Sequence, residues 1–562
     1  MPFLYSFLRY KKNLLSGFVA KVVMATLACA VGIPLHAETS AYRLRRILIA
    51  DTETKVTALQ PPPEAGPVIA QEVPLLATAE FAAVMASYFD QSITIELLNR
   101  LVPEISNYLK NHDRPIVDVQ IPNQNVATGD LRLVVTIGRY NQLKFSGNRW
   151  FSRELLEAKL GIKPGDEIRL STLDEAVNWA NANPFRHIQV VLNNLPNQAN
   201  SKDLLIFTQE VLPLRLACSY DNTGPALLGE NRYTAAIQFG NAWGLDHLAS
   251  YQFTTTDRLR LSQTHSGDYR IPLPWHHYLQ LAAAYGTQQP SFADGLFNLK
   301  GKSLLTSLRY IAPVTAGPWS MEFSAGLDFK RTNNNFEFGG YQISSSENDV
   351  YQASFGTTVL RRDAYGATSL GLNLSLSPGS IDSRNTDLAF ASTRYGSTSR
   401  YAVGQMQIQR LTRLPGQWQV FSRVVLQLAS TNLLGTEQLS IGGQGTVRGY
   451  DERIFTGDEG WIVSNEFQAP QWTTPLRLRS ANTKLPPLQT RLLTFWDCGK
   501  VAYKHRFSSD IPLDPLMGAG IGLRCNAGNA FSLSADYGWQ LRNTTFRQPN
   551  RSRGHIQATI AY

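Results

Sequence analysis

The sequence has few charged residues and no long uninterrupted apolar segment. Only 17% of its 562 residues are Asp, Glu, Lys or Arg, whereas about 25% is usual in soluble domains. After the N-terminal region there is no run of about 18 uncharged apolar residues, the minimum for a spanning helix. The composition therefore disfavours both an ordinary soluble surface and a helical membrane protein.

Cysteine is also scarce. The chain has four, and Cys218, Cys498 and Cys525 form neither a metal-binding spacing nor a disulfide-rich scaffold. Two interpretations of Cys498 and Cys525 stay open. They either bond across a hairpin centred near residue 511 or remain thiols that face lipid, which we favour.

The first 37 residues carry four basic side chains and no acidic one. An uncharged segment over residues 22–35 precedes Leu35-His36-Ala37, and this pattern predicts a cleaved export signal over residues 1–37. The alternative is a single anchor helix, which is disfavoured because the apolar segment is short and contains Pro34. Removal of the signal lowers the formal net charge from +9 to +5, so we expect no nucleic-acid partner.

The periodicity of the sequence changes near residue 213. Residues 38–140 and 141–212 each show the order strand, helix, helix, strand, strand, and the first copy carries a Pro-rich insertion at residues 61–67. The internal repeat predicts two small α+β domains in front of a third region, residues 213–562.

Two-residue alternation dominates residues 213–562. Leu370, Leu372 and Leu374, for example, alternate with small and polar residues. Such runs suit tilted strands that cross a bilayer, which need about 9–11 residues. Sixteen runs predict an all-β transmembrane barrel of about 16 antiparallel strands, with long outer connections at residues 331–348 and 430–459. A secreted β-sandwich or solenoid is the competing fold.

Four glycines surround one arginine in the long connection before the twelfth predicted strand, in Ile441-Gly-Gly-Gln-Gly-Thr-Val-Arg-Gly-Tyr-Asp451. This density of glycine marks a tight turn. The thirteenth strand contains Phe495-Trp-Asp-Cys-Gly499, and alternation directs Phe495, Asp497 and Gly499 toward the lumen.

A carboxylate inside a narrow lumen needs a partner, and a guanidinium can donate two parallel hydrogen bonds to it. We therefore predict that the loop around Arg448 folds back into the barrel and pairs with Asp497. Glu466, on the twelfth strand, is a secondary candidate partner. The alternative is that these residues are independent and solvated.

Several motifs resemble those of one superfamily. Val447-Arg448-Gly449-Tyr450 and Phe495-x-Asp497-x-Gly499 resemble the paired signatures of barrels that carry POTRA domains. The α+β units resemble POTRA domains themselves. Asp221-Asn222-Thr223-Gly224 is similar to the start of the barrel in two-partner secretion transporters, the hemolysin secretion/activation family. Tyr562 resembles the C-terminal signal that barrel assembly machinery reads.

The resemblance implies an outer-membrane transporter of a Gram-negative-type cell, with its POTRA domains in the periplasm. Its implied partners are an unfolded secreted exoprotein, hemolysin-like or adhesin-like, then outer-membrane lipid, and the barrel assembly machinery during biogenesis. Family members hold the arginine loop in the lumen, where it supports secretion. Family members often have a plug helix before the first POTRA domain, whereas only residues 38–44 lie between the predicted signal and the first predicted strand here, so both interpretations, with and without a plug, stay open. The alternatives are an assembly or insertion factor of the same superfamily and a diffusion pore.

Enzymatic motifs are not apparent. Gly295 and Gly301-Lys302-Ser303 only approach a phosphate-binding loop, because their spacing is one residue too long. His276-His277 has no metal-ligand spacing around it, and no nucleophile elbow or zinc-protease motif occurs. We expect no catalytic activity, no metal and no cofactor.

Overall fold

The structure is a computed structural model. It describes residues 42–60, 62, 64–196, 198–292, 297–338, 341–475, 486–508, 510–545 and 550–562. The predicted export signal, with Cys29, lies outside these residues. The chain divides into two compact units, one ending at Thr136 and one formed by Ile137–Tyr562 together with Lys110–Asp118.

The first unit is built on a four-stranded sheet in the order β2-β1-β4-β3, in which β1 runs parallel to both β2 and β4. The helix α3 is amphipathic because Leu97, Leu101 and Ile105 recur every four residues and are buried. The elements are β1 (Arg46–Ala50), α1 (Glu53–Ala58), β2 (Val68–Ala70), α2 (Ala79–Met85), α3 (Ile95–Asn111), β3 (Val117–Gln120) and β4 (Asp130–Ile137). Neither α1 nor β2 is anticipated by the sequence pattern, since both flank the Pro-rich insertion.

The second unit begins with a three-stranded sheet in the order β5-β7-β6. Ser152 caps α4 by accepting a hydrogen bond from the backbone N–H of Leu155. Leu156, Leu173 and Ile188 join the two helices to the sheet in one buried core. The elements are β5 (Arg139–Ser146), α4 (Arg153–Leu160), α5 (Leu170–Ala180), β6 (Arg186–Leu195) and β7 (Gln198–Glu210).

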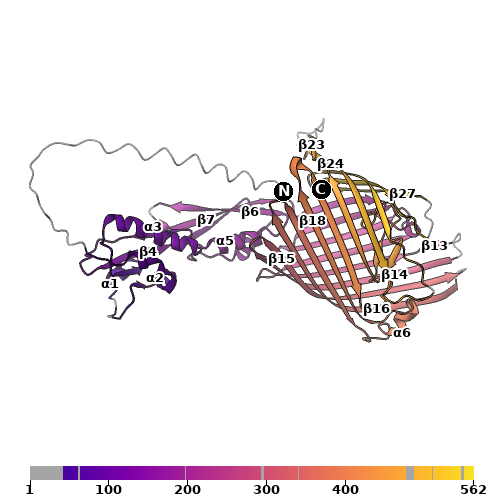
Figure 1. The fold of residues 1–562 in the computed structure, drawn as a ribbon, viewed down its shortest axis with the longest axis horizontal. Helices are drawn as coiled ribbons and strands as arrows, with labels where there is room; N and C mark the ends of the chain where they lie inside the picture. The colour runs from indigo at the N-terminus through magenta and orange to yellow at the C-terminus, as the bar shows by residue number, and fades with distance from the viewer. Residues whose placement is uncertain are drawn as a thin grey trace, which may run out of the picture. The chain divides into compact units, whose positions relative to one another are not determined.

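The rest of the second unit is a closed antiparallel barrel, whose tilted strands are visible in Figure 1. Sixteen long strands form it in the described chain: β8 (Leu214–Asp221), β9 (Arg232–Ala242), β10 (His247–Thr256), β11 (Ser262–Pro272), β12 (Tyr278–Gln288), β14 (Phe297–Ala316), β15 (Trp319–Phe338), β16 (Tyr341–Asp363), β17 (Gly366–Pro378), β18 (Arg400–Arg413), β19 (Gln419–Ala429), β22 (Glu459–Gln468), β24 (Leu488–Ala502), β25 (Leu516–Ala527), β26 (Phe531–Gln540) and β27 (Ser552–Ala561). The short strands β13 (Ser291–Phe292) and β23 (Trp472–Thr474) extend β14 and β24 pairing. The predicted strand number is confirmed.

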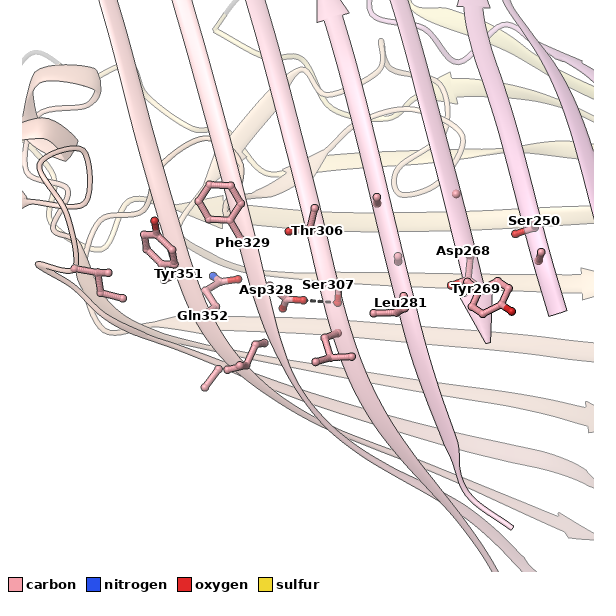
Figure 2. Close-up of a pocket in the computed structure, with 18 of the residues that line it drawn as sticks. Ser250, Asp268, Tyr269, Leu281, Thr306, Ser307, Asp328, Phe329, Tyr351 and Gln352 are labelled. Atoms are coloured by element: carbon pink, nitrogen blue, oxygen red, sulfur yellow. Dashed lines mark hydrogen bonds between the residues drawn. The ribbon is translucent and has the colours of Figure 1, made fainter. Parts of the chain in front are cut away.

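The barrel wall has a polar inner row and an apolar outer row. Ser307, Asp328 and Gln352 are cross-strand neighbours, and Figure 2 shows Asp328 hydrogen-bonded to Ser307. Leu308 and Leu327, one residue along, are exposed on the opposite face. This alternation is that of a membrane barrel with a wet lumen. Among the described residues, no helix is both long and apolar enough to cross a membrane.

One predicted connection is wrong. Residues 331–338 and 341–348 continue β15 and β16 as a paired ribbon in place of an open loop. Their pairing extends well beyond the length that a bilayer requires, and the sequence pattern missed it because Asn and Ser are common there. Conversely, residues 379–399, between β17 and β18, form an unpredicted connection that carries α6 (Asp387–Thr393).

The predicted hairpin register of the two late cysteines is also wrong. Cys498 lies opposite Met517, whereas Cys525 lies opposite Thr490. The offset of eight residues along the strands separates the two thiols by about 27 Å at the usual rise per residue. Both cysteines are free thiols, so the disulfide hypothesis is excluded in this register.

The second α+β domain and the barrel meet at a buried ionic junction. Asp246, in the turn after β9, receives hydrogen bonds from Arg186 at 2.5 and 3.0 Å and from Asn183 at 2.8 Å. The Lys159 ammonium lies 3.0 Å from the same carboxylate. Burial lowers the pKa of Lys159, and Asp246 opposes that shift. Arg186 and Lys159 therefore share one buried carboxylate. This contact fixes the second α+β domain to the turn between β9 and β10.

Replacement of Asp246 by Ala leaves Arg186 and Lys159 buried without an anion. We expect a loss of about 3–5 kcal/mol in the stability of the junction, because removing one partner of a buried ion pair strands the other. Urea titration of the purified protein in detergent, with proteolysis of residues 137–212 as the readout, measures this. The exposed pair Arg153–Glu157 is the control, since Glu157→Ala should change the midpoint little. Equal midpoints for the two variants would contradict the role of Asp246.

Candidate functional site

A hairpin from the long connection between β19 and β22 folds into the barrel. Its two short strands, β20 (Leu439–Ile441) and β21 (Phe455–Gly457), pair with each other and their tip contains residues 442–454. The tip is held by an apolar cluster that joins it to the wall. The cluster consists of Val425, Leu439, Ile441, Val447, Tyr450, Phe455, Ile462, Val501 and Leu516.

Arg448 and Asp497 are in direct contact at the end of this hairpin. The guanidinium donates two hydrogen bonds to the carboxylate, from Nε at 2.7 Å and from Nη2 at 2.9 Å, and the Arg448 backbone N–H adds a third at 3.2 Å. Asp497 is 0% exposed. The Arg448 guanidinium also lies 3.6 Å from the centre of the Phe495 ring. The pairing is bidentate and desolvated, which makes it strong and directional.

The arginine has further anionic neighbours on the adjacent strands. Glu466 accepts a hydrogen bond from Arg448 Nη1 at 2.7 Å, and Asp536 lies 3.8 Å from the same nitrogen. Arg524 binds Asp536 at 2.7 Å and Glu466 at 3.4 Å. Arg524 and Asp536 were not among the predicted site residues. The alternation of residues along β25 and β26 directs both side chains toward the lumen. It does not show which of the lumen-facing polar residues the hairpin contacts.

The hairpin approaches the wall closely because the wall carries glycines. A Cβ on Gly518 would overlap the carbonyl oxygen of Arg448, and one on Gly538 would come within 2.6 Å of the Gly449 nitrogen. Gly499, the last residue of the predicted strand motif, faces Val447 with a Cβ distance of 3.3 Å. The glycines therefore serve as a seat for the backbone of the hairpin.

Tyr450 fixes the other side of the tip. The side chain is fully buried, and its hydroxyl oxygen lies 2.7 Å from the carbonyl oxygen of Arg542, to which it can donate, and 2.9 Å from that of Met517. Gln540 also donates to the carbonyl oxygen of Gly449 at 2.9 Å. All four residues of the predicted loop motif, Val447 to Tyr450, thus contact strands β24 to β26 or the connections beside them.

The motif at the start of the barrel lies at its closing seam. The pairing of β8 with β27 covers only residues 217–221. Beyond it, the Asn222 side chain accepts from the Ile556 N–H at 2.8 Å and donates to the Gly554 oxygen at 2.9 Å. The Asn222 backbone N–H also donates to the Ile556 carbonyl oxygen at 3.2 Å, so this side-chain amide supplements the backbone ladder at the end of the seam.

The neighbours of Asn222 shape the turn that follows. Asp221 accepts hydrogen bonds from Arg232 at 2.8 Å and from the Thr223 hydroxyl at 2.5 Å. Gly224 passes so close to the Gly229 carbonyl that a side chain would overlap it. At the opposite end of the seam, Tyr562 exchanges backbone hydrogen bonds with Leu216 at 2.8 and 3.1 Å, and its ring is exposed.

No cofactor geometry emerges from these contacts. In the part of the chain that the structure describes, no group of three or more His, Cys, Asp or Glu side chains is arranged to hold a metal ion. His276 binds Glu175 at 3.0 Å and packs against Trp179, so it belongs to the contact between α5 and the barrel. Asp497, Glu466 and Asp536, the acidic residues at the hairpin tip, are occupied by Arg448 and Arg524.

Comparison with known proteins agrees with this architecture. A sequence model described as haemolysin secretion/activation protein ShlB/FhaC/HecB matches residues 200–525, and one for the ShlB-type POTRA domain matches residues 68–138. The chain belongs to this family. It is an outer-membrane transporter that secretes a partner exoprotein, and its N-terminal domains are periplasmic.

Individual relatives have low sequence identity to this chain, but the similarity covers most of its length. The outer membrane transporter CdiB of Dickeya dadantii (strain 3937) is 21% identical over 494 residues, 85% of this chain and 82% of that protein. The hemolysin transporter protein ShlB of Serratia marcescens is 23% identical over 71% of this chain and 70% of its own. The structure of CdiB from Escherichia coli has a TM-score of 0.69 at 15% identity, covering 96% and 94% of the two chains, which shows the common fold.

Substitution of Gly518 by Ala should displace the hairpin without altering the register of β25. The added Cβ meets the Arg448 carbonyl, and we expect a cost of about 1–3 kcal/mol, typical of overpacking. The measurement is the rate of tryptic cleavage at Arg448 and Arg453 in detergent-solubilised protein, which should increase.

Gly404→Ala is the matched control, because a Cβ there has no atom within 4 Å. The proposed seat is contradicted if Gly518→Ala and Gly404→Ala are cleaved at the same rate.

Proposed function

We propose that the exoprotein crosses the outer membrane unfolded, through the barrel lumen, and that the Arg448 hairpin keeps this route in a secretion-competent form. The bidentate Arg448–Asp497 pair carries the proposal, because its charges are buried where cargo has to pass. Folding of the cargo outside the cell would bias its movement outward. In this mechanism the protein is a passive conduit and no catalytic step is needed.

Two periplasmic POTRA domains, residues 38–140 and 141–212, are proposed to capture the cargo. In the second, β5 is an edge strand, and a groove of about 880 Å³ lies between β5 and α4. An extended segment can pair with such an edge while its side chains enter the groove. This supports strand addition as the mode of capture.

The position of the second POTRA domain supports delivery into the barrel. Its ionic junction with Asp246 and the contacts of Glu175 and Trp179 with His276 involve two successive turns at one end of the barrel. Cargo bound to this domain would therefore be released beside the periplasmic opening.

Outer-membrane lipid and the barrel assembly machinery are further proposed partners. The apolar outer row of the wall, with exposed Leu308 and Leu327, supports contact with lipid. The exposed aromatic ring of Tyr562 at the chain end of β27 supports recognition during assembly. The cargo is proposed to be hemolysin-like or adhesin-like, by analogy with the hemolysin transporter of Serratia marcescens.

Arg448→Ala should abolish or strongly reduce secretion while leaving the barrel inserted. The substitution strands the Asp497 carboxylate, a loss of about 3–5 kcal/mol of local stability, whereas the strand pairing of the wall is untouched. The cargo is first identified as the protein that disappears from the medium on deletion of this gene. Its amount in the medium is then measured against the amount of folded, heat-modifiable barrel.

Arg448→Lys is the informative companion variant, because it keeps the charge and removes the two-pronged geometry. It should also secrete poorly. Normal secretion by Arg448→Ala at a normal level of folded barrel would refute the role assigned to the hairpin.

A further inference from the structure

Three outer connections meet at one buried carboxylate, Asp458. This residue directly precedes β22, at the end of the barrel opposite the Asp246 turn, and is 0% exposed. Arg394 donates to it from Nη1 at 2.5 Å and from Nη2 at 3.0 Å. Lys504 donates to it from its backbone N–H at 3.0 Å. Arg394 and Lys504 belong to different connections, residues 379–399 and 503–515, so the carboxylate ties both to its own.

The carboxylate is also bonded within its own connection. The Leu433 N–H donates at 2.9 Å and the Gln438 amide at 3.1 Å. Asp458 thus accepts five hydrogen bonds, only two of which come from a charged group. None of its partners belongs to the Arg448 cluster, the ionic group formed by Arg448, Glu466, Asp497, Arg524 and Asp536.

The three connections contact one another beyond Asp458. The Asn432 side chain exchanges hydrogen bonds with the His505 backbone at 2.7 and 2.9 Å. The rings of Tyr395 and Phe507 pack edge to face at 4.5 Å. Leu433 and Leu434 are buried in a cluster with Phe390 of α6 and Val350 of β16.

The same assembly reaches a distant part of the wall. Glu437, four residues after Leu433, accepts from Lys330 on β15 at 2.8 Å and from Gln352 on β16 at 2.7 Å. The contacts therefore run from the seventh strand of the barrel to the connection between the thirteenth and fourteenth. The outer connections are therefore tied to one another and to the wall over that part of the circumference.

We propose that the connections at residues 379–399, 430–458 and 503–515 close the outer end of the lumen, and that Asp458 is the residue that positions them. In this proposal the cargo leaves when Arg394 dissociates from Asp458. Arg394 is the accessible partner, with 21% of its side chain exposed against 0% for Asp458. Withdrawal of the guanidinium leaves the carboxylate with neutral donors only, which is unfavourable for a buried charge, so the connections separate together. The inference rests on the proposed passage of cargo through the lumen.

The first test measures the closure without cargo. Purified variants are inserted into planar bilayers in potassium chloride, and the resting ion conductance is compared. Asp458→Asn and Arg394→Ala should raise it several-fold at equal amounts of heat-modifiable barrel. Should Asp458→Asn lower the amount of folded barrel, Arg394→Ala decides, because it leaves Asp458 its neutral donors.

Arg410→Ala is the matched control. Arg410 makes a bidentate pair with Asp363, at 2.6 and 3.0 Å, near the periplasmic end of the barrel. Its loss should leave the resting conductance unchanged. Wild-type conductance in Arg394→Ala overturns the inference.

The second test separates the closure from the transport route. Tyr395→Cys and Phe507→Cys are combined in a variant whose native cysteines are replaced by serine, and a short bismaleimide joins them. The tether should keep conductance low and stop secretion. Secretion that continues through a tethered, non-conducting barrel refutes the lumen route and leaves the closure standing. Conductance that stays high in tethered Arg394→Ala refutes the closure.

Discussion

The burial of one charge pair organises the most constrained part of this protein. Asp497 is fully enclosed by the barrel wall and by the hairpin, so its charge has to be neutralised by a partner that enters the lumen. Arg448 does this while also bonding Glu466 on β22 and facing Asp536 on β26. One guanidinium therefore couples a connection to three strands. The apolar cluster around the hairpin and the glycines of β25 and β26 allow the hairpin to approach the wall closely enough for Arg448 to reach Asp497.

The conduit has its anchoring contacts at three levels. At the periplasmic end, Asp246 binds Arg186 and Lys159 of the second α+β domain. Inside the lumen, the Arg448 cluster holds the hairpin tip. At the outer end, Asp458 joins separate connections. Each level relies on a carboxylate with little or no solvent access and on at least one arginine, so each is specific in geometry and intolerant of a missing partner.

Alternation was sufficient to predict the barrel and its strand number, whereas the predicted pairing of Arg448 with Asp497 also depended on the resemblance of both motifs to those of barrels that carry POTRA domains. Parity alone directs Asp497 inward, and glycine density marks the connection that bears Arg448. The participation of Arg524 and Asp536 could not be predicted, because both depend on the shear between β25 and β26. The separation of Cys498 and Cys525 depends on a different register, that of β24 with β25, which the geometry of the connecting turn sets.

Connections were the least predictable elements. The ribbon formed by β15 and β16 uses Asn and Ser, residues that ordinarily indicate turns, and it is stabilised by pairing that only the folded hairpin provides. The helix α6 depends on contacts such as that of Phe390 with Leu433, which lie far apart in the sequence. These features are tertiary in origin, whereas the wall strands are encoded locally.

The side-chain hydrogen bonds of Asn222 across the seam of the barrel have a mechanical consequence. The seam between β8 and β27 has five paired residues, against nine between β26 and β27. Beyond Asp221 it is held by one backbone hydrogen bond of Asn222 and by the side-chain amide of the same residue. Resistance to widening is thus uneven around the circumference and is lowest along this line. A radial load from a bulky translocating segment would concentrate its strain there, on the five residue pairs and on the hydrogen bonds of Leu216 and Asn222 that extend them at either end.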